Sequence, residues 1–321
     1  MLGKVSLIGG QPRRVLIFGG SGTAGQGALR ALVAAGHEVT CVLRVSQDLP
    51  VGVREIIAEV ALPLQISDHF DVVVSCIASR TGTPKDAWAI DHDAQLNILT
   101  FAQTVGVSQF ILLSAICLQK PKLPFQYAKL AFEEALMCSG LDFSIVRPTA
   151  FFKSLSGQLD RVRANKPFLV FGDGKLTACK PISDDDLGQF IADCIDNPLR
   201  RNQILPIGGP GPAITPLDQA EGLFGILDQP LKVRRLPVGL IFGLQTVLGV
   251  IGWVFPKIQD KAELMRIGYY YATESMLFLN EETGRYDADA TPSTGSETLF
   301  DYYKELIVTD KTVQRGDHSV F

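Results

Sequence analysis

A glycine-rich turn between residues 19 and 27 sets the strongest limit on the fold of this chain. The run "RVLIFG" before it reads as a buried strand, and "GGSGTAGQG" supplies Gly19, Gly22 and Gly25 in G-x-x-G-x-x-G spacing at the start of a helical pattern. Glycine is required where such a turn is tight and where backbone amides must approach a pyrophosphate at a helix N-terminus. Because a second strand follows the helix, the context favours a dinucleotide site over a tight turn without a ligand.

The first half of the chain alternates apolar, β-rich runs with helical patterns. This alternation is typical of a parallel sheet that is wound on both faces. Runs such as "VVVSCIA" are almost continuously apolar, as expected when helices cover both faces of the sheet. We predict strands at 14–19, 38–44, 54–60, 71–78, 109–116 and 142–148, with helices near 23–35, 91–105 and 125–139.

Beyond Pro148 the regular alternation stops. A strand-like "FLVFGDGK" precedes a helix with Ser183 as N-cap, Thr215-Pro216 opens another helix, and "ETLFDYYKELI" forms a last amphipathic helix. We therefore predict an α/β protein: a Rossmann-type, doubly wound parallel sheet over residues 1–150, and a smaller C-terminal substrate lobe over residues 151–321. Elements of 170–207 are left free to return to the sheet.

Composition excludes some classes of partner. The net charge of −4, without a sustained cationic stripe, argues against nucleic-acid binding. The six cysteines contain no C-x-x-C pair or metal-ligand spacing, so no metal site is predicted and the thiols are expected to be reduced in a core. Hydrophobic residues make up 46% of the chain, and this composition is compatible with an apolar ligand or with a membrane contact.

The end of the second strand carries the residue that selects the cofactor. An acidic side chain there would bind the ribose 2′-hydroxyl of NAD, whereas arginine accommodates a 2′-phosphate. The sequence has Arg44, which favours NADPH, although a solvated strand-end arginine is the alternative. After the fourth strand, the small residues Ser75, Ala78 and Ser79 stand where a cofactor must pass close to the backbone.

The segment "FQYAKLAFEEAL" resembles the catalytic helix of a short-chain reductase without its tyrosine. Phe125 stands four residues before Lys129, where the phenol of a Tyr-x-x-x-Lys pair would be, and Tyr127 points to a different helix face. Ser114 ends the fifth strand and is read either as a serine that faces the nicotinamide or as a hydroxyl bonded to local backbone. Three interpretations follow: a nucleotide sensor without turnover, an ordinary amphipathic helix, or an enzyme that reduces a conjugated carbon–carbon double bond.

Longer motifs carry a family resemblance from the first strand to about Phe300. The runs "LLSAICLQKPKLPFQYAKLAFEEAL", "SIVRPTAFFKSLSGQ", "FGDGKLTACKPIS" and "GYYYATESM" resemble the NADPH-dependent divinyl chlorophyllide 8-vinyl reductases, which are atypical short-chain dehydrogenase/reductases. The resemblance implies hydride transfer from NADPH to the 8-vinyl group of divinyl chlorophyllide or protochlorophyllide. It also implies that Lys129 orients the cofactor ribose and that NADPH is held by Gly19, Ser21, Gly22, Thr23, Ala24, Gly25 and Arg44.

Two features of this reading stay open on sequence alone. The proton donor is Lys129, Tyr127 or water. The rival from another class is a non-catalytic NADP(H)-binding sensor or assembly factor with the same nucleotide domain. The predicted partner is a tetrapyrrole, and the sequence gives no oligomeric state.

Aromatic and basic residues of the second half are candidates for substrate contact. Phe125, Phe151 and Phe152 suit a flat macrocycle, but core packing is the simpler explanation for each one. Arg147 ends a strand and would pair either with a substrate carboxylate or with a buried acid such as Asp173.

The start of the chain and one apolar segment bear on where the protein lies in the cell. The start "MLGKVSLIGGQPRR" runs directly into a strand and resembles no transit peptide, so we expect a bacterial or cyanobacterial cytoplasm. Residues 237–255 are long and apolar enough to be considered as a transmembrane helix, yet they contain Gln245 and four glycines. We favour a buried or pigment-covering helix there, with peripheral membrane contact compatible with either reading.

Overall fold

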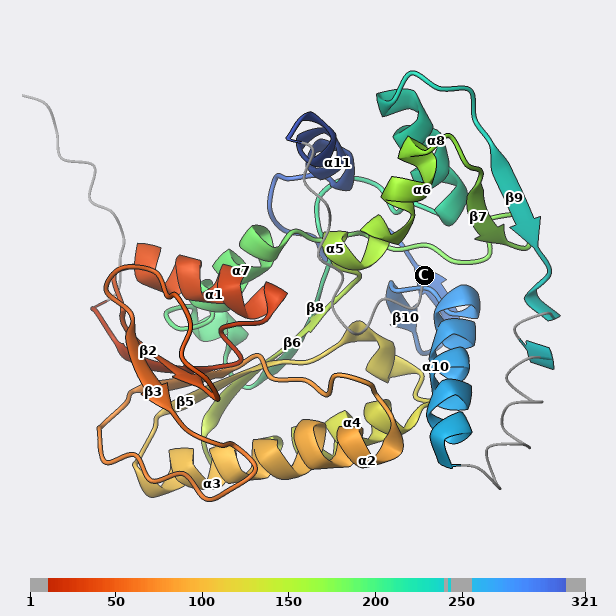
Figure 1. Cartoon of the computed structure of the whole chain (residues 1–321). Helices are drawn as coiled ribbons and strands as arrows, with labels where there is room; N and C mark the ends of the chain where they lie inside the picture. The colour runs from red at the N-terminus through yellow and green to blue at the C-terminus, as the bar shows by residue number, and fades with distance from the viewer. Residues whose placement is uncertain (1–10, 240–241, 244–255, 310–321) are drawn as a thin grey trace, which may run out of the picture.

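The computed structural model describes residues 11–239, 242–243 and 256–309, and a seven-stranded sheet forms its centre (Figure 1). All neighbouring strands in this sheet are parallel, in the order β3-β2-β1-β4-β5-β6-β8. The order reverses between β1 and β4, which is the doubly wound arrangement, so the predicted fold class is confirmed. The strands span Arg14–Phe18 (β1), Glu38–Leu43 (β2), Arg54–Ile57 (β3), Val72–Ser75 (β4), Gln109–Leu113 (β5), Asp142–Pro148 (β6) and Gln203–Ile207 (β8).

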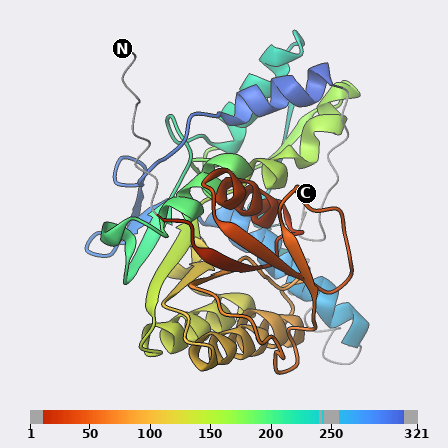
Figure 2. The same cartoon turned by 90° about the vertical axis from the view of Figure 1, so that its left-hand side faces the viewer.

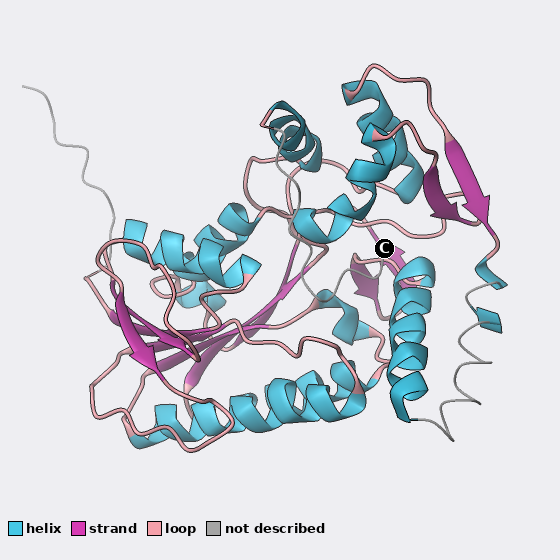
Figure 3. Cartoon of the chain, in the orientation of Figure 1, coloured by secondary structure: helices cyan, strands magenta, loops and turns pink. Residues whose placement is uncertain are grey.

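Helices cover both faces of the sheet, as Figures 2 and 3 show. One face carries α1 (Thr23–Ala34) and α7 (Asp184–Asp193), and the other carries α3 (Gln95–Thr104) and α4 (Pro124–Met137). Each face has its own apolar cluster, so the central strands bury side chains in both directions. This explains why their sequences lack a polar alternation.

Helices α1 and α7 pack backbone to backbone through two glycines. A Cβ on Gly188 would lie 2.3 Å from the carbonyl carbon of Gly27, and a Cβ on Gly27 would lie 2.0 Å from the Asp184 carbonyl oxygen. Neither position accepts a side chain without separating the helices. The start of α7 is thereby fixed beside the start of α1.

The helical region predicted at 91–105 has an irregular beginning. A short helix, α2 (Pro84–Ala87), leads into a π-helical turn, η1 (Trp88–Ala94), before α3 begins. Such π turns are rare and occur mostly at functional sites. A 3₁₀ turn, η2 (Ile116–Gln119), similarly connects β5 to α4.

The second half of the chain contributes to the sheet and also forms a separate layer. Strand β8 extends the sheet beside β6, and a 3₁₀ turn, η4 (Pro198–Arg200), precedes it. Strands β7 (Phe168–Phe171) and β9 (Val233–Leu236) pair away from the main sheet. Around them a third apolar cluster joins α5 (Phe152–Leu155), α6 (Leu159–Arg163), α8 (Pro216–Ile226) and α11 (Leu299–Val308), and the 3₁₀ turn η3 (Ser156–Gln158) connects α5 to α6.

Side-chain caps begin α7 and α8 as predicted, and α11 has one that was not predicted. Ser183 accepts from the Asp186 amide at the start of α7, and Thr215 accepts from the Asp218 amide at the start of α8. Thr298 caps α11 in the same way. These hydroxyls satisfy amides that the helix itself leaves without partners.

The last part of the chain packs against the start of α4. Helix α10 (Pro256–Thr273) is followed by a small hairpin of β10 (Phe278–Asn280) and β11 (Arg285–Asp287). Most of the apolar segment 237–255, and with it most of the helix predicted there, lies outside the described residues. Within the part of the chain that the structure describes, no helix has the length and apolarity needed to cross a bilayer.

The six cysteines are free thiols. Cys41, Cys117 and Cys194 are buried, but Cys138 is exposed, so the expectation of a core position is wrong for that residue. Cys138 follows directly after α4, at the helix end where the chain returns to the surface.

Candidate active site

The glycine turn lies where the strand order reverses, at the carboxyl ends of β1 and β4. Gly19 has φ +77°, and a Cβ there would lie 2.6 Å from the Cys76 carbonyl carbon. A Cβ on Gly25 would lie 2.0 Å from the Gly19 carbonyl oxygen. Glycine is therefore required at both positions by close backbone contact, and this edge is the usual ligand site of an open α/β sheet.

The first turn of α1 is left without a side-chain cap. Gly22 is its N-cap residue, and no acidic side chain lies in the first turn. By contrast, α7 begins with the Ser183 cap and three aspartates. The amides of Thr23 and Ala24 are consequently available to an anion, which fits the pyrophosphate of a dinucleotide.

The remaining predicted cofactor residues differ in exposure. Arg44 is exposed directly after β2, and within the described residues no ion pair engages it. Ser21 and Ala78 are also exposed, whereas Ser75 and Ser79 are buried. The Ser75 hydroxyl donates a hydrogen bond to Gln95 Oε1 over 2.8 Å and so links the end of β4 to the start of α3.

Lys129 is held by an acid that sequence reasoning missed. Its Nζ lies 2.9 Å from Asp91 Oδ1, and the Lys129 and Asp91 side chains are 12% and 0% exposed. The same oxygen accepts the Ser79 backbone amide at 3.1 Å. Asp91 Oδ2 is buried and has no hydrogen-bond partner among the described residues. Asp91 lies in the π-helical turn η1, and such turns occur mostly at functional sites.

A narrow crevice, too small to hold a water molecule, adjoins this ion pair. Residues from η1, α3, the end of β5 and α4 line it. Ser114 and Lys129, which were both predicted as site residues, are among them. Its lining consists of Asp91, Gln95, Leu112, Leu113, Ser114, Lys129 and Phe132.

Ser114 and Arg147 meet at a second buried acid, Glu133. The Ser114 hydroxyl donates to Glu133 Oε1 at 2.5 Å, and Arg147 donates from Nε to the same oxygen at 3.1 Å and from Nη2 to Oε2. Glu133 is buried, and the Arg147 side chain is 13% exposed. Arg147 thus pairs with Glu133 rather than with Asp173, and the Ser114 hydroxyl bonds a carboxylate rather than local backbone.

The other candidate residues lie outside this cluster. The Tyr127 hydroxyl donates to the Pro121 carbonyl oxygen at 3.1 Å, and its side chain is exposed. Phe125 is buried against Ile267 and Tyr270 of α10. Phe152 is buried in the second-half cluster, and Phe151 packs against the sheet.

One sequence signal would have identified Glu133. It stands four residues after Lys129, so both side chains point to the same side of α4. Asp91 gave a weaker signal, because an acid in a helical pattern is usually solvated and only the tertiary contact with Lys129 distinguishes this one.

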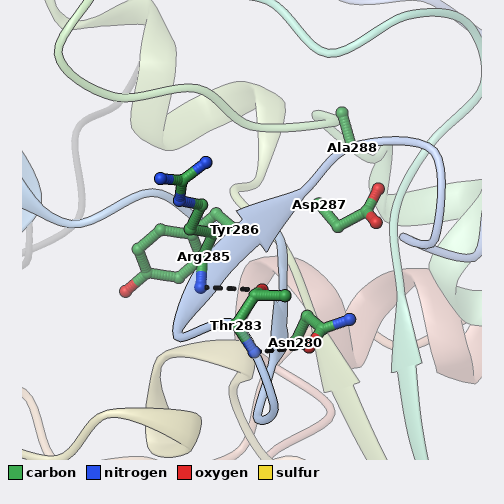
Figure 4. A pocket seen from close by; sticks show the side chains of 6 residues that line it. All are labelled: Asn280, Thr283, Arg285, Tyr286, Asp287 and Ala288. Carbon is green, nitrogen blue, oxygen red and sulfur yellow. Dashed lines mark hydrogen bonds between the residues drawn. The ribbon is translucent and has the colours of Figure 1, made fainter.

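A hollow of about 530 Å³ lies on the β10–β11 hairpin (Figure 4). The residues that line it come from the hairpin alone, and two of its hydrogen bonds brace the turn: the Thr283 amide to Asn280 Oδ1 and the Arg285 amide to Thr283 Oγ1. This hollow is not formed by the carboxyl edge of the sheet or by the Lys129–Asp91 pair, and we assign it no ligand.

Known proteins resemble the chain at two levels. The family model described as NAD(P)H-binding matches residues 19–198. The chloroplastic divinyl chlorophyllide a 8-vinyl-reductase of Cucumis sativus is 45% identical over 332 residues, covering 96% of this chain and 79% of that protein. The corresponding protein of Oryza sativa subsp. indica is 42% identical over 331 residues, covering 96% and 82%.

More distant similarities extend the comparison. The photosystem II assembly factor Ycf39 of Synechocystis sp. is 26% identical over 205 residues, which cover 61% of this chain and 62% of that protein. The solved structure of the epimerase Mth375 from Methanothermobacter thermautotrophicus has a TM-score of 0.67 at 15% identity, covering 94% of each chain. At that identity the likeness bears on the fold alone.

The expected bacterial or cyanobacterial cytoplasm is wrong. The relatives at 45% and 42% identity are named as chloroplastic proteins of plants, which conflicts with that location. The expectation rested on the first residues of the sequence, and these carry no information on the compartment.

Two observations decide the family. The NAD(P)H-binding match covers more than half of the chain and begins at the glycine turn, where α1 offers free amides. The match to the plant reductases spans nearly the whole chain at an identity far above that of the assembly factor. The chain therefore belongs to the NAD(P)H-binding family and, within it, to the divinyl chlorophyllide a 8-vinyl-reductases.

Proposed function

We propose that this protein uses NADPH to reduce the 8-vinyl group of divinyl chlorophyllide or divinyl protochlorophyllide to an ethyl group. The observation that carries the proposal is the 45% identity, over 96% of the chain, to a protein named for this reaction. The buried Lys129–Asp91 pair is consistent with it, because Asp91 keeps one buried carboxylate oxygen without a partner among the described residues, and that oxygen is available to a ligand.

The cofactor is NADPH, held by both ends of the site. The free amides at the start of α1 support a pyrophosphate contact by Gly22, Thr23 and Ala24. The guanidinium of Arg44 at the end of β2 is exposed and has no ion pair among the described residues, which supports a contact with the 2′-phosphate. When bound, NADPH supplies the hydride.

The Arg44 assignment has a direct test in binding. Arg44→Asp replaces a phosphate ligand by a charge that repels phosphate, so NADPH affinity should fall by about tenfold or more while NADH affinity changes little. Calorimetric titration with both dinucleotides measures the difference. Arg285→Asp, at an exposed arginine of the β10–β11 hairpin, is the matched control, and equal losses for NADPH and NADH in Arg44→Asp would remove Arg44 from the phosphate site.

Lys129 orients the nicotinamide ribose in this proposal. Asp91 fixes its ammonium through Oδ1, and the orphaned Oδ2 is suited to accept a hydrogen bond from a ribose hydroxyl. Lys129 or water then gives the proton that completes the ethyl group. Tyr127 is disfavoured as the donor, because its hydroxyl is engaged by Pro121 on the exposed side of α4.

The missing phenol is consistent with this chemistry. Hydride addition to the vinyl terminus leaves negative charge that the conjugated macrocycle delocalises, so no alkoxide needs a tyrosine donor. Phe125 is buried among α10 side chains, which supports a packing role for the ring. Substrate contact by Phe125, Arg147, Phe151 or Phe152 would require their present packing and ion pairs to open.

The alternative is a non-catalytic NADP(H)-binding assembly factor, favoured by the similarity to Ycf39. Incubation of purified protein with NADPH and divinyl chlorophyllide, followed by chromatography, separates the two. An enzyme converts the pigment to the 8-ethyl product, and Lys129→Met lowers the rate. Binding of both ligands with no product would reject the reductase and favour the assembly factor.

A further inference from the structure

Lys153 contacts the glycine turn from the second half of the chain. Its Nζ donates a hydrogen bond to Thr23 Oγ1 over 3.0 Å. Thr23 is the first residue of α1, and its backbone amide is one of those that the helix leaves without an internal acceptor. The ammonium therefore lies at the end of α1 where a phosphate binds.

Backbone contacts fix the position of this lysine. The Ile182 amide donates to the Ala150 carbonyl at 3.0 Å, and the Phe152 amide donates to the Ile182 carbonyl at 3.3 Å. Ile182 leads into α7, whose first residue touches Gly27 of α1. The segment that carries Lys153 is thus tied to α7, and α7 is tied to α1.

The charged residues around the glycine turn leave Lys153 as a candidate ligand for a phosphate. The turn at 19–27 contains no lysine or arginine, and Arg30, further along α1, is paired with Asp185 at 2.6 Å. The acid that faces Lys153 is Asp184, whose Oδ1 is buried and has no hydrogen-bond partner among the described residues. Burial raises the pKa of Asp184 to about 6, although Arg30 and Lys153 act to lower it.

We propose that Lys153 is a cationic ligand of the cofactor pyrophosphate, an inference that rests on the proposed NADPH-dependent function. Lysine acts here as a point charge on a flexible stem, which suits a phosphate group approached from one side. Because the pyrophosphate is common to both nicotinamide cofactors, Lys153 strengthens binding without selecting between them. It also makes the cofactor site depend on a residue beyond 150.

The test is a comparison of dinucleotide affinities in Lys153→Gln. Glutamine keeps a donor for Thr23 Oγ1 but removes the charge, so the contact between α5 and α1 is retained. We expect affinity for NADPH and for NADH to fall by a similar factor of about ten. Lys153→Arg should recover most of the loss for both cofactors. Calorimetric titration gives the affinities, and thermal melts confirm that each variant is folded.

Lys166→Gln is the matched control, because Lys166 is an exposed lysine of the same half of the chain. Unchanged affinities in Lys153→Gln would reduce Lys153 to a structural tie and overturn the inference. A loss confined to NADPH would also overturn it, by moving Lys153 to the 2′-phosphate. If the natural protein binds neither dinucleotide, the proposed function fails as well; if it reduces the vinyl group while Lys153→Gln binds normally, only the inference fails.

Discussion

At the scale of single residues, the Lys129–Asp91 pair is the most demanding feature of the site. Burying two charges is costly unless they are paired, and Asp91 is fully buried with one oxygen still lacking a partner among the described residues. A buried oxygen left without a partner calls for an explanation, and a bound ligand, a catalytic role or a buried water supplies one. The ion pair therefore joins η1, which carries Asp91, to α4, which carries Lys129.

The coupling between these two residues is measurable. Asp91→Asn leaves the Lys129 charge without its partner, so we expect lower stability and at least tenfold slower vinyl reduction at saturating NADPH. In a Lys129→Met background, Asp91→Asn should cost less stability, giving a coupling energy of about 1–3 kcal/mol in a double-mutant cycle followed by denaturant unfolding.

Asp93→Asn is the control for this cycle. Asp93 lies two residues away and pairs with His92 at the surface, where its side chain is 68% exposed. Its loss should change neither rate nor stability appreciably. Additive effects of Asp91→Asn and Lys129→Met would contradict the account of one functional ion pair.

At the scale of elements, the contact between α1 and α7 positions the cofactor edge. Gly188→Ala would place a methyl group against the Gly27 backbone, and we expect a loss of about 1–3 kcal/mol in the free energy of unfolding. Gly225→Ala in α8 is the matched control, since nothing lies within 4 Å of its Cβ position. That substitution should be neutral or stabilising, because alanine favours helix over glycine. Equal effects at both sites would show that the α1–α7 contact adjusts freely.

A second element contact ties the approach to α4 to the end of α10. Glu274 is buried and accepts from Lys120 Nζ at 2.8 Å, from Lys122 Nζ and from the Tyr286 hydroxyl at 2.9 Å. Burial acts to raise the pKa of Glu274, but these hydrogen bonds prevail and hold it below the ordinary value of 4.5. A lowered carboxylate pKa contributes stability that is fully present above the unfolded value and is lost as pH falls through the folded value.

Glu274→Gln should therefore destabilise the protein by about 1–3 kcal/mol at pH 7. The difference from the natural protein should shrink as pH falls from about 4.5 through the lowered folded-state pKa, because Glu274 then becomes an uncharged carboxyl group while Gln stays uncharged throughout. Urea unfolding across this range measures it, with exposed Glu281→Gln as control. A difference that is constant with pH would argue against a role for the Glu274 charge.

At the scale of the whole molecule, local patterns predicted the nucleotide half well. Strands β1 to β6 and the glycine turn follow from short-range signals: apolar runs, turn residues and a helix start. The pairing of Arg147 with Glu133 and of Lys129 with Asp91 depends on how α4 meets β6 and η1, which no local pattern encodes. The lobe boundary at residue 150, the peripheral membrane contact and the substrate residues stay predictions.

The central claim is that NADPH delivers its hydride to the 8-vinyl group in this protein. NADPH deuterated at C4 of the nicotinamide, in separate 4R and 4S forms, tests it in a reaction with divinyl chlorophyllide in ordinary water. The account predicts that one of the two forms gives an 8-ethyl product carrying one deuterium on its terminal carbon, as read by mass spectrometry and NMR. An 8-ethyl product without deuterium from either form, or no product at all, would contradict it.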